Sequence, residues 1–279
     1  MPPELTREEA DRLRAFERRG HDAMAPAYYD FFSRITALAT TPVLDAAGVT
    51  EGTCLLDVAT GPGALAAAAL ARGAQPIGID LSPGMLELAR RLHPGIEFRE
   101  ADVEHLPLAD STFDAVVCSF GLGHFPLPEA ALAECIRVLK PGGRVVFAWW
   151  AEPSRQRIQG LFREAVADVG VALPADVPAG HSSLRFCETA EFLRLLEGSG
   201  LEGVAIEDHA TTFRVESADA LFQGGLSSMV LTGAAIRTQE PATQDIVRAA
   251  FVRRARAYER PDGLHVPIAF RIGSGAKPG

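Results

Sequence analysis

The sequence is poor in lysine, because only Lys140 and Lys277 among its 27 basic residues are lysines. With 36 acidic residues the formal net charge is −9 and the pI about 5.3, so nucleic-acid binding driven by bulk charge is not expected. The N-terminus lacks an apolar signal region, and no hydrophobic run approaches the ~18 residues of a membrane span. We therefore predict a cytoplasmic protein with no nucleic-acid partner and no membrane span.

Cysteine is scarce as well. The four cysteines show no CxxC or other metal-binding spacing, which excludes a disulfide scaffold and fits a reducing compartment. Apart from His124, the histidines form no cluster with ligand spacing in the sequence; they are His21, His93, His105, His181, His209 and His265. We therefore expect no metal.

Apolar residues make up 47% of the chain, which is ample for a large core. A short apolar run typical of a buried strand lies at 54–58, further predicted strands lie at 76–80, 96–99, 115–118 and 144–148, and strand-like segments follow at 204–215 and 266–272. Between the earlier runs, helical patterns cover 64–72, 82–92 and 129–140. This alternation predicts an α/β fold: a Rossmann-like, doubly wound, mostly parallel seven-stranded sheet with helical cap insertions.

Helical patterns also flank the alternating region. They predict helices at 6–20 (ended by Gly20), 27–47 (interrupted at Pro42), 155–169, 188–197, 218–237 and 243–260. We expect one domain over 1–279, with an N-terminal helical cap at 1–52 and a ligand-binding core at 53–150. Residues 151–279 would add the remaining strands and a helical cap over the substrate.

The first predicted strand ends in Asp57 and a turn that contains Gly61 and Gly63. Two glycines between a strand and a helix let a ligand approach the backbone, at the sheet edge where α/β proteins bind ligands. The pattern also fits a dinucleotide fingerprint, with Asp80 as the ribose-binding acid, so an NAD(P)-dependent oxidoreductase is an alternative. Asp57 favours a cationic ligand over a dinucleotide, since it would repel a pyrophosphate and attract an ammonium or sulfonium group.

Further motifs follow the later strands. The segment 100–103 (EADV) offers a carboxylate and a backbone amide to an adenine edge, and 139–143 (LKPGG) turns a helix into the next strand. Together these motifs resemble the class I S-adenosylmethionine-dependent methyltransferases over about 53–150. The segments 57–63 (DVATGPG), 78–86 (GIDLSPGML), 101–107 (ADVEHLP) with 113–114 (FD), and 119–122 (SFGL) are most similar to the ubiquinone/menaquinone C-methyltransferase, or methyltransferase type 11, branch.

The resemblance implies S-adenosylmethionine as cofactor, S-adenosylhomocysteine as its product, and methyl transfer by in-line displacement. By analogy, Asp80 would bind both ribose hydroxyls, Asp102 with the Val103 amide would read the adenine edge, and the Ser119 carbonyl would accept the methionine ammonium. The implied cofactor-binding residues are Asp57, Thr60, Gly61, Gly63, Asp80, Leu81, Met85, Asp102, Val103 and Ser119.

The chain departs from the quinone branch after 119–122. Where that branch has an Arg-Asn pair, this sequence has Gly123-His124-Phe125, and a long helical segment at about 217–263 precedes the last strand. We therefore do not transfer the quinol substrate, and expect a small aromatic or prenyl-like acceptor.

His124 is of a residue type suited to removing a proton near neutral pH, so it is the candidate general base. The candidate substrate walls are Tyr28, Tyr29, Phe32 and Trp149. A second alternative is a cofactor-binding protein that turns over no acceptor. The sequence leaves open whether carbon, nitrogen or oxygen of the acceptor is methylated. It also leaves open whether the protein self-associates.

Overall fold

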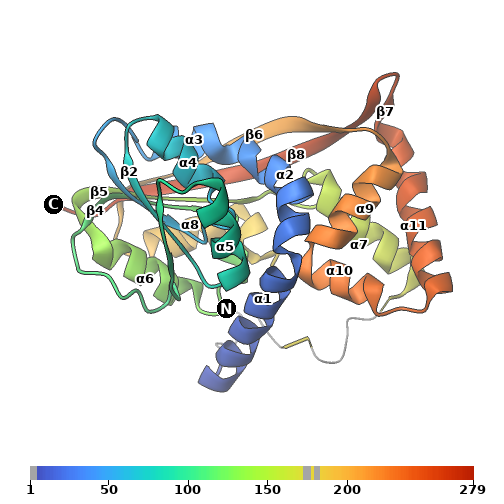
Figure 1. Ribbon diagram of the computed structural model, residues 1–279, viewed down its shortest axis with the longest axis horizontal. Helices are drawn as coiled ribbons and strands as arrows, with labels where there is room; N and C mark the ends of the chain where they lie inside the picture. The colour runs from blue at the N-terminus through green and yellow to red at the C-terminus, as the bar shows by residue number, and fades with distance from the viewer. Residues whose placement is uncertain (1–4, 172–176, 179–182) are drawn as a thin grey trace.

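A central sheet organises the molecule (Figure 1). The computed structural model describes residues 5–171, 177–178 and 183–279. In these residues the strand order is β3-β2-β1-β4-β5-β8-β6, and the two-residue β7 pairs with β8. The strands are β1 (Cys54–Val58), β2 (Gln75–Asp80), β3 (Glu97–Glu100), β4 (Phe113–Ser119), β5 (Leu139–Trp150), β6 (Glu202–Val215), β7 (Glu259–Arg260) and β8 (Gly263–Ala276).

Strands β1 to β5 are parallel to one another, whereas β8 is antiparallel to both β5 and β6. The predicted mostly parallel sheet of seven strands is confirmed, with β7 as a short addition. The chain order changes direction at β1, which has β2 on one side and β4 on the other. This is the topological switch point, the place where open α/β sheets bind ligands.

Helices surround the sheet and extend it to one side. The first group is α1 (Arg7–Ala27), the short π-helix η1 (Tyr28–Phe32), α2 (Ser33–Thr36), η2 (Ala37–Ala39), α3 (Thr40–Ala46), α4 (Ala64–Ala71), α5 (Pro83–Leu92), η3 (Leu122–His124) and α6 (Pro128–Val138). The second group is α7 (Arg157–Val169), η4 (Arg185–Cys187), α8 (Thr189–Glu197), α9 (Ala218–Ser228), α10 (Val230–Arg237), α11 (Pro241–Ala255) and η5 (Arg256–Tyr258). Among the described helices, none is both long and apolar enough to cross a membrane.

The N-terminal helix differs from the prediction. Thr6 and Glu9 form a capping box at its start, but the helix does not end at Gly20 and continues to Ala27. A Cβ atom at Gly20 would lie 2.5 Å from Cγ1 of Val230, so this glycine permits a close crossing of α1 and α10. The expected break at Pro42 is also wrong, because the helix tightens one turn earlier, at η2.

Three other boundaries differ from the sequence prediction. Lys140, expected at a helix end, lies on β5. The helix expected over 218–237 divides at Met229 into α9 and α10, and the one expected over 243–260 ends at Ala255. These are differences of boundary rather than of element type, and tertiary packing commonly decides such boundaries.

The helices form a layer on each face of the sheet and a separate group at one end. In Figure 1, α3 lies above the sheet and contacts β4, β5 and β8, while α6 and α8 lie below and contact β5 and β8. Helices α7, α9, α10 and α11 pack together beside the antiparallel pair of strands β6 and β8. The long helix α1 contacts α5 on one side and α9 and α10 on the other, so it joins the strand-rich part to this C-terminal group.

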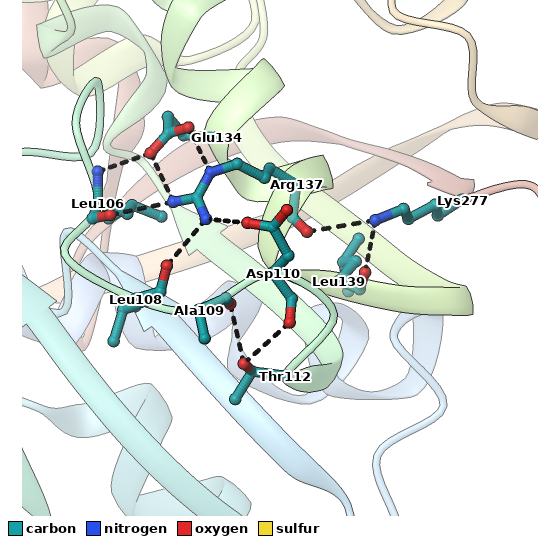
Figure 2. Close-up of polar contacts among 9 residues, drawn as sticks. All are labelled: Leu106, Leu108, Ala109, Asp110, Thr112, Glu134, Arg137, Leu139 and Lys277. Carbon is teal, nitrogen blue, oxygen red and sulfur yellow. Dashed lines mark hydrogen bonds and ion pairs between the residues drawn. The ribbon is translucent and has the colours of Figure 1, made fainter.

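The loop between β3 and β4 is held by one guanidinium group (Figure 2). Arg137 of α6 donates to the carbonyls of Leu106 and Leu108 and to the carboxylates of Asp110 and Glu134. Glu134 also accepts the Leu106 N–H at 2.7 Å. Charge-assisted, bidentate contacts of this kind are among the stronger hydrogen bonds in proteins, so α6 fixes the loop that continues from β3.

Candidate active site

A cavity of about 240 Å³ opens at the carboxyl ends of β1, β2 and β4. Its walls come from the ends of these strands, from the start of α5, from the loop after β3, from η3 and from the end of β5. Helix α1, η1 and the start of α10 close it from outside the sheet. The cavity therefore lies at the topological switch point.

The turn after β1 is shaped by Asp57. This side chain is 1% exposed, and its Oδ2 accepts hydrogen bonds from the Thr60 hydroxyl at 2.6 Å and from the Ala66 N–H at 3.1 Å. Burial raises the pKa of the Asp57 carboxyl to about 7, although both hydrogen bonds oppose the rise. Asp57 thus lies behind the turn and organises it.

Gly61 and Asp80 connect the turn to the end of β2. Gly61 has φ +54° and its N–H donates to Oδ2 of Asp80 at 2.8 Å, while the Ser82 N–H donates to Oδ1 at 2.9 Å. Burial raises the pKa of Asp80, and these N–H groups oppose the rise. Both Gly61 and Asp80 line the cavity, and a Cβ atom on Gly61 would meet no atom within 4 Å.

The loop after β3 brings Asp102 and Glu104 to the cavity, and Arg14 of α1 binds both. The Arg14 Nε lies 2.7 Å from Oδ2 of Asp102, while its Nη2 pairs with Glu104, whose side chain has 0% exposure. Glu104 also accepts the N–H of Leu127 at 2.8 Å, just before α6. The N-terminal helix is therefore part of this wall.

The end of β4 is a second tight turn. Phe120 has φ +62° and stacks on Trp150 with ring centroids 3.7 Å apart. Positive φ is rare for a bulky residue and is commonly found at functional sites. Gly123 approaches Trp149 so closely that a Cβ atom there would lie 2.0 Å from Cζ2 of the indole. Both tryptophans line the cavity although each is almost fully buried.

His124 meets two side chains of α1 at the cavity. Its Nδ1 lies 3.1 Å from Oε2 of Glu17, and its ring is perpendicular to that of His21 with centroids 5.0 Å apart. One ligand atom from each of the three residues falls within a 4.8 Å group. The expectation that His21 belongs to no ligand-spaced cluster is therefore wrong, because helix α1 folds back over the β4 turn.

The predicted site residues separate into two sets. Those that line the cavity are Gly61, Asp80, Leu81, Met85, Asp102, Val103, Ser119, His124, Tyr28, Phe32 and Trp149. The other four predicted residues are not among the described residues that line the cavity; they are Asp57, Thr60, Gly63 and Tyr29. The first two form the hydrogen bond behind the turn, Gly63 caps α4, and Tyr29 is 41% exposed.

Sequence reasoning missed the polar residues that α1 brings to the cavity, namely Arg14, Glu17, Arg18 and His21. Their spacing is a partial signal, since residues three or four apart share one helix face. Asp22, one residue further on, accepts from the Ser82 hydroxyl and the Gly84 N–H and so fixes α1 against the start of α5. The sequence contains no indication of which strand ends this face would meet.

Comparison with known proteins agrees with this geometry. The model of the methyltransferase domain family matches residues 56–147. The ubiquinone/menaquinone biosynthesis C-methyltransferase of Syntrophotalea carbinolica is 34% identical over 214 residues, covering 67% of this chain and 86% of that protein. The demethylmenaquinone methyltransferase of Renibacterium salmoninarum is 37% identical over 159 residues, 55% of this chain and 65% of that one.

Among solved structures, a phosphoethanolamine N-methyltransferase of Haemonchus contortus in complex with S-adenosylhomocysteine has a TM-score of 0.58 at 18% identity. That match covers 96% of this chain and 60% of the other, and it shows a shared fold. The fold and the site are those of the class I methyltransferases. The chain belongs to the S-adenosylmethionine-dependent methyltransferase family, and it spans less than two thirds of the length of the demethylmenaquinone methyltransferases that it matches.

Proposed function

We propose that this protein transfers a methyl group from S-adenosylmethionine to a small-molecule acceptor. The observation that carries the proposal is the pair formed by Gly61 and Asp80 at the switch point, where an open glycine turn holds a carboxylate that lines the cavity. The same cavity wall contains Asp102. These groups fit the cofactor, because carboxylates accept hydrogen bonds from its ribose hydroxyls and from its adenine amino group. They also attract its two positive charges.

Each part of the cofactor has a partner among the cavity residues. Asp80 would bind the ribose hydroxyls, and Leu81 and Met85 would cover the adenine, whose edge Asp102 and the Val103 amide would read. The Gly61 turn, with Thr60 and Gly63 supporting it and Asp57 behind it, would hold the methionine part together with the Ser119 carbonyl. When bound, the cofactor supplies a methyl group on a positively charged sulfur, which needs no acid to leave.

The work left to the chain is positioning and exclusion of water. Holding two reactants in line can contribute roughly 7–11 kcal/mol to lowering the barrier. Tyr28, Phe32 and Trp149 line the same cavity, and their faces suit a flat aromatic acceptor or the isoprenoid chain of a prenyl-like one. The quinone-related names of the relatives support an aromatic acceptor, whereas His124 in place of the Arg-Asn pair argues against carrying over the quinol itself.

A dinucleotide would bind this turn poorly. Pyrophosphate groups use the N–H groups at a helix N-terminus, and in this protein Asp57 already accepts the Ala66 N–H in the first turn of α4. That N–H group is therefore not free to bind a phosphate. The oxidoreductase alternative therefore receives no support from the geometry, and the family comparisons do not support it either.

Calorimetric titration of the purified protein tests the proposal. We expect S-adenosylhomocysteine to bind in the micromolar range or tighter, and NADH and NADPH to bind at least 100-fold more weakly. A panel of phenols, enols, amines and prenylated rings with S-adenosylmethionine should then identify an acceptor through formation of S-adenosylhomocysteine. Binding of NADH in preference to S-adenosylhomocysteine would overturn the proposal, and cofactor binding without turnover of any acceptor would favour a non-catalytic binding protein.

A further inference from the structure

Glu17, His21 and His124 form a polar cluster that lines the cavity, and the ring of His124 lies against that of Trp149 with centroids 5.9 Å apart. Glu17 and His21 are one turn apart on α1, and His124 ends η3 after β4. The two elements are separated by about a hundred residues in the chain, so the fold alone brings the cluster together. The methyl-transfer chemistry proposed above leaves Glu17 and His21 without an assigned role.

The hydrogen bond to Glu17 decides which ring nitrogen of His124 carries the proton. His124 Nδ1 lies 3.1 Å from the Glu17 carboxylate, so in the neutral ring Nδ1 carries the proton and donates it to Oε2. The lone pair of the neutral ring then lies on Nε2, which is a hydrogen-bond acceptor. A carboxylate that fixes the tautomer of a histidine base is a recurrent arrangement in enzymes.

The surroundings of His124 also affect its charge. Burial lowers the pKa of His124, but the charge and hydrogen bond of Glu17, together with the charge of Asp80, raise it above 6.5 on balance. β5, which packs against η3, supplies the neutral Trp149 at this point. Other titratable groups on the elements around η3 include His21, Arg14 and Arg18 of α1, which line the same cavity, and Arg185 and Cys187 of η4.

The same three side chains could be thought to hold a metal ion, but their hydrogen bonds favour another role. His21 Nδ1 lies 2.9 Å from the carbonyl oxygen of Glu17, so this nitrogen is already engaged by the helix backbone. Its distance to the Glu17 carboxylate is 3.5 Å, and that oxygen is already 3.1 Å from His124. A metal ion bound through these Nδ1 and Oε2 atoms would need these contacts to be broken.

We propose that Glu17 positions His124 as the base that deprotonates the methyl acceptor, and that the acceptor accordingly presents a phenolic or enolic hydroxyl. The inference rests on the proposed methyltransferase function. The hydroxyl proton moves to Nε2 of His124, and the electron pair left on the acceptor forms the bond to the methyl carbon. The bond from that carbon to sulfur breaks and its electron pair stays on sulfur. The Glu17 carboxylate balances the imidazolium charge, so Glu17 is a positioning residue.

The first test uses the cofactor-free protein and needs no acceptor. Histidine ring signals are followed by NMR across pH 5–9 in the wild type, in Glu17→Gln and in the matched control Glu8→Gln, an exposed glutamate of the same helix. Glu17→Gln should lower the pKa of His124, because the carboxylate charge is lost while the amide oxygen can still accept from Nδ1. Glu8→Gln should leave it unchanged. An unchanged His124 pKa in Glu17→Gln overturns the proposal.

The second test measures turnover of a phenolic acceptor from the panel. The wild-type kcat should rise with pH through the His124 pKa, because the base must be neutral. Glu17→Gln should move this rise to lower pH and reduce the plateau about 10-fold, and His124→Gln should reduce kcat about 10²–10⁴-fold. Tertiary amines and thioethers, which carry no such proton, should be methylated no better by the wild type than by His124→Gln.

Controls separate this inference from the proposed function. Both variants should bind S-adenosylhomocysteine with the wild-type affinity, since neither residue is assigned to the cofactor. If S-adenosylhomocysteine fails to bind the wild type, the proposed function itself fails. If it binds but the pH profiles of wild type and Glu17→Gln coincide, only the positioning role fails. Stoichiometric binding of Zn²⁺ to the cofactor-free protein that is lost in Glu17→Gln and His21→Phe would instead identify a metal site and overturn the inference.

Discussion

Arg14 of the N-terminal helix lies with its Nε 2.7 Å from Oδ2 of Asp102, the carboxylate that follows β3 at the cavity. The same guanidinium pairs with Glu104, which has no exposed side-chain area and also binds the Leu127 N–H before α6. One cation of α1 therefore joins the proposed adenine-binding loop to the first turn of α6. Because Asp22 at the other end of α1 binds the start of α5, the helix is fixed at two points along the cavity.

The first prediction concerns this guanidinium. Arg14→Gln should lower the free energy of unfolding by about 3 kcal/mol, because it leaves the buried Glu104 carboxylate without its cation. It should also weaken S-adenosylhomocysteine binding, since Asp102 loses a fixed position. The double variant Arg14→Gln/Glu104→Gln should recover part of the stability. Urea unfolding measures the stability and calorimetry the cofactor affinity. The control is Arg12→Gln, which removes an exposed ion pair with Glu8 on the same helix and should change neither quantity.

The second prediction concerns Asp80. Asp80→Asn keeps the size of the side chain but loses the charge that would bind two ribose hydroxyls. Hydrogen bonds to a charged group contribute about 1.5–3 kcal/mol, so the Kd for S-adenosylhomocysteine should rise about 10- to 100-fold. Asp45→Asn, at a surface carboxylate that pairs with Arg72, is the matched control and should bind as the wild type does. A change of less than threefold in Asp80→Asn would show that this carboxylate does not bind the cofactor.

The sequence predicts the sheet well because its signals are local. Most core strands contain a short apolar run, and α5 begins at a marked residue, Ser82, whose hydroxyl accepts the Met85 N–H as a helix cap. Asp80 and Gly61 could be assigned to one site because parallel strands end at the same edge of a sheet. These features need no knowledge of distant contacts.

What could not be predicted depends on contacts between distant segments. A glycine such as Gly20 commonly marks a helix end, yet here it lets Val230 approach α1. Val230 lies more than 200 residues later in the chain. Glu17 and His21 belong to an ordinary amphipathic helix until that helix packs over the β4 turn. Asp57 was correctly expected near the glycine turn, but only its burial and its bonds to Thr60 and Ala66 show that it faces the helix behind the turn.

The third prediction uses a glycine. Gly123→Ala would place a Cβ atom 2.0 Å from Cζ2 of Trp149, so the indole must move out of its place in the cavity wall. Overpacking of this kind costs about 1–3 kcal/mol. We expect a higher KM for the acceptor with little change in S-adenosylhomocysteine affinity, because all the proposed cofactor residues except Ser119 lie at or after the ends of β1, β2 and β3. Gly95→Ala is the control, since a Cβ atom there meets nothing within 4 Å. Equal KM values for the two variants would contradict the assignment of Trp149 to the acceptor wall.

The last prediction follows from the burial that raises the pKa of Asp57 from 3.8 to about 7. A raised carboxyl pKa means that the folded state holds the proton more tightly, so this stabilisation is complete below 3.8 and is lost as the pH rises to about 7. The stability of the wild type relative to Asp57→Asn should therefore fall between pH 4.5 and 7 and stay constant above that. At 1.36 kcal/mol per pKa unit, the full difference is about 4 kcal/mol.

Chemical denaturation of both proteins at half-unit pH intervals measures this difference. Asp114→Asn provides the control, because the Lys140 ammonium lowers the pKa of Asp114 and its contribution is lost only at more acidic pH. The difference in the free energy of unfolding between the wild type and Asp114→Asn should therefore be constant between pH 4.5 and 8. A flat profile for Asp57→Asn as well would mean that the hydrogen bonds from Thr60 and Ala66 outweigh burial and keep Asp57 ionised. In that case its negative charge would be available, throughout the neutral range, to attract a cationic ligand at the turn.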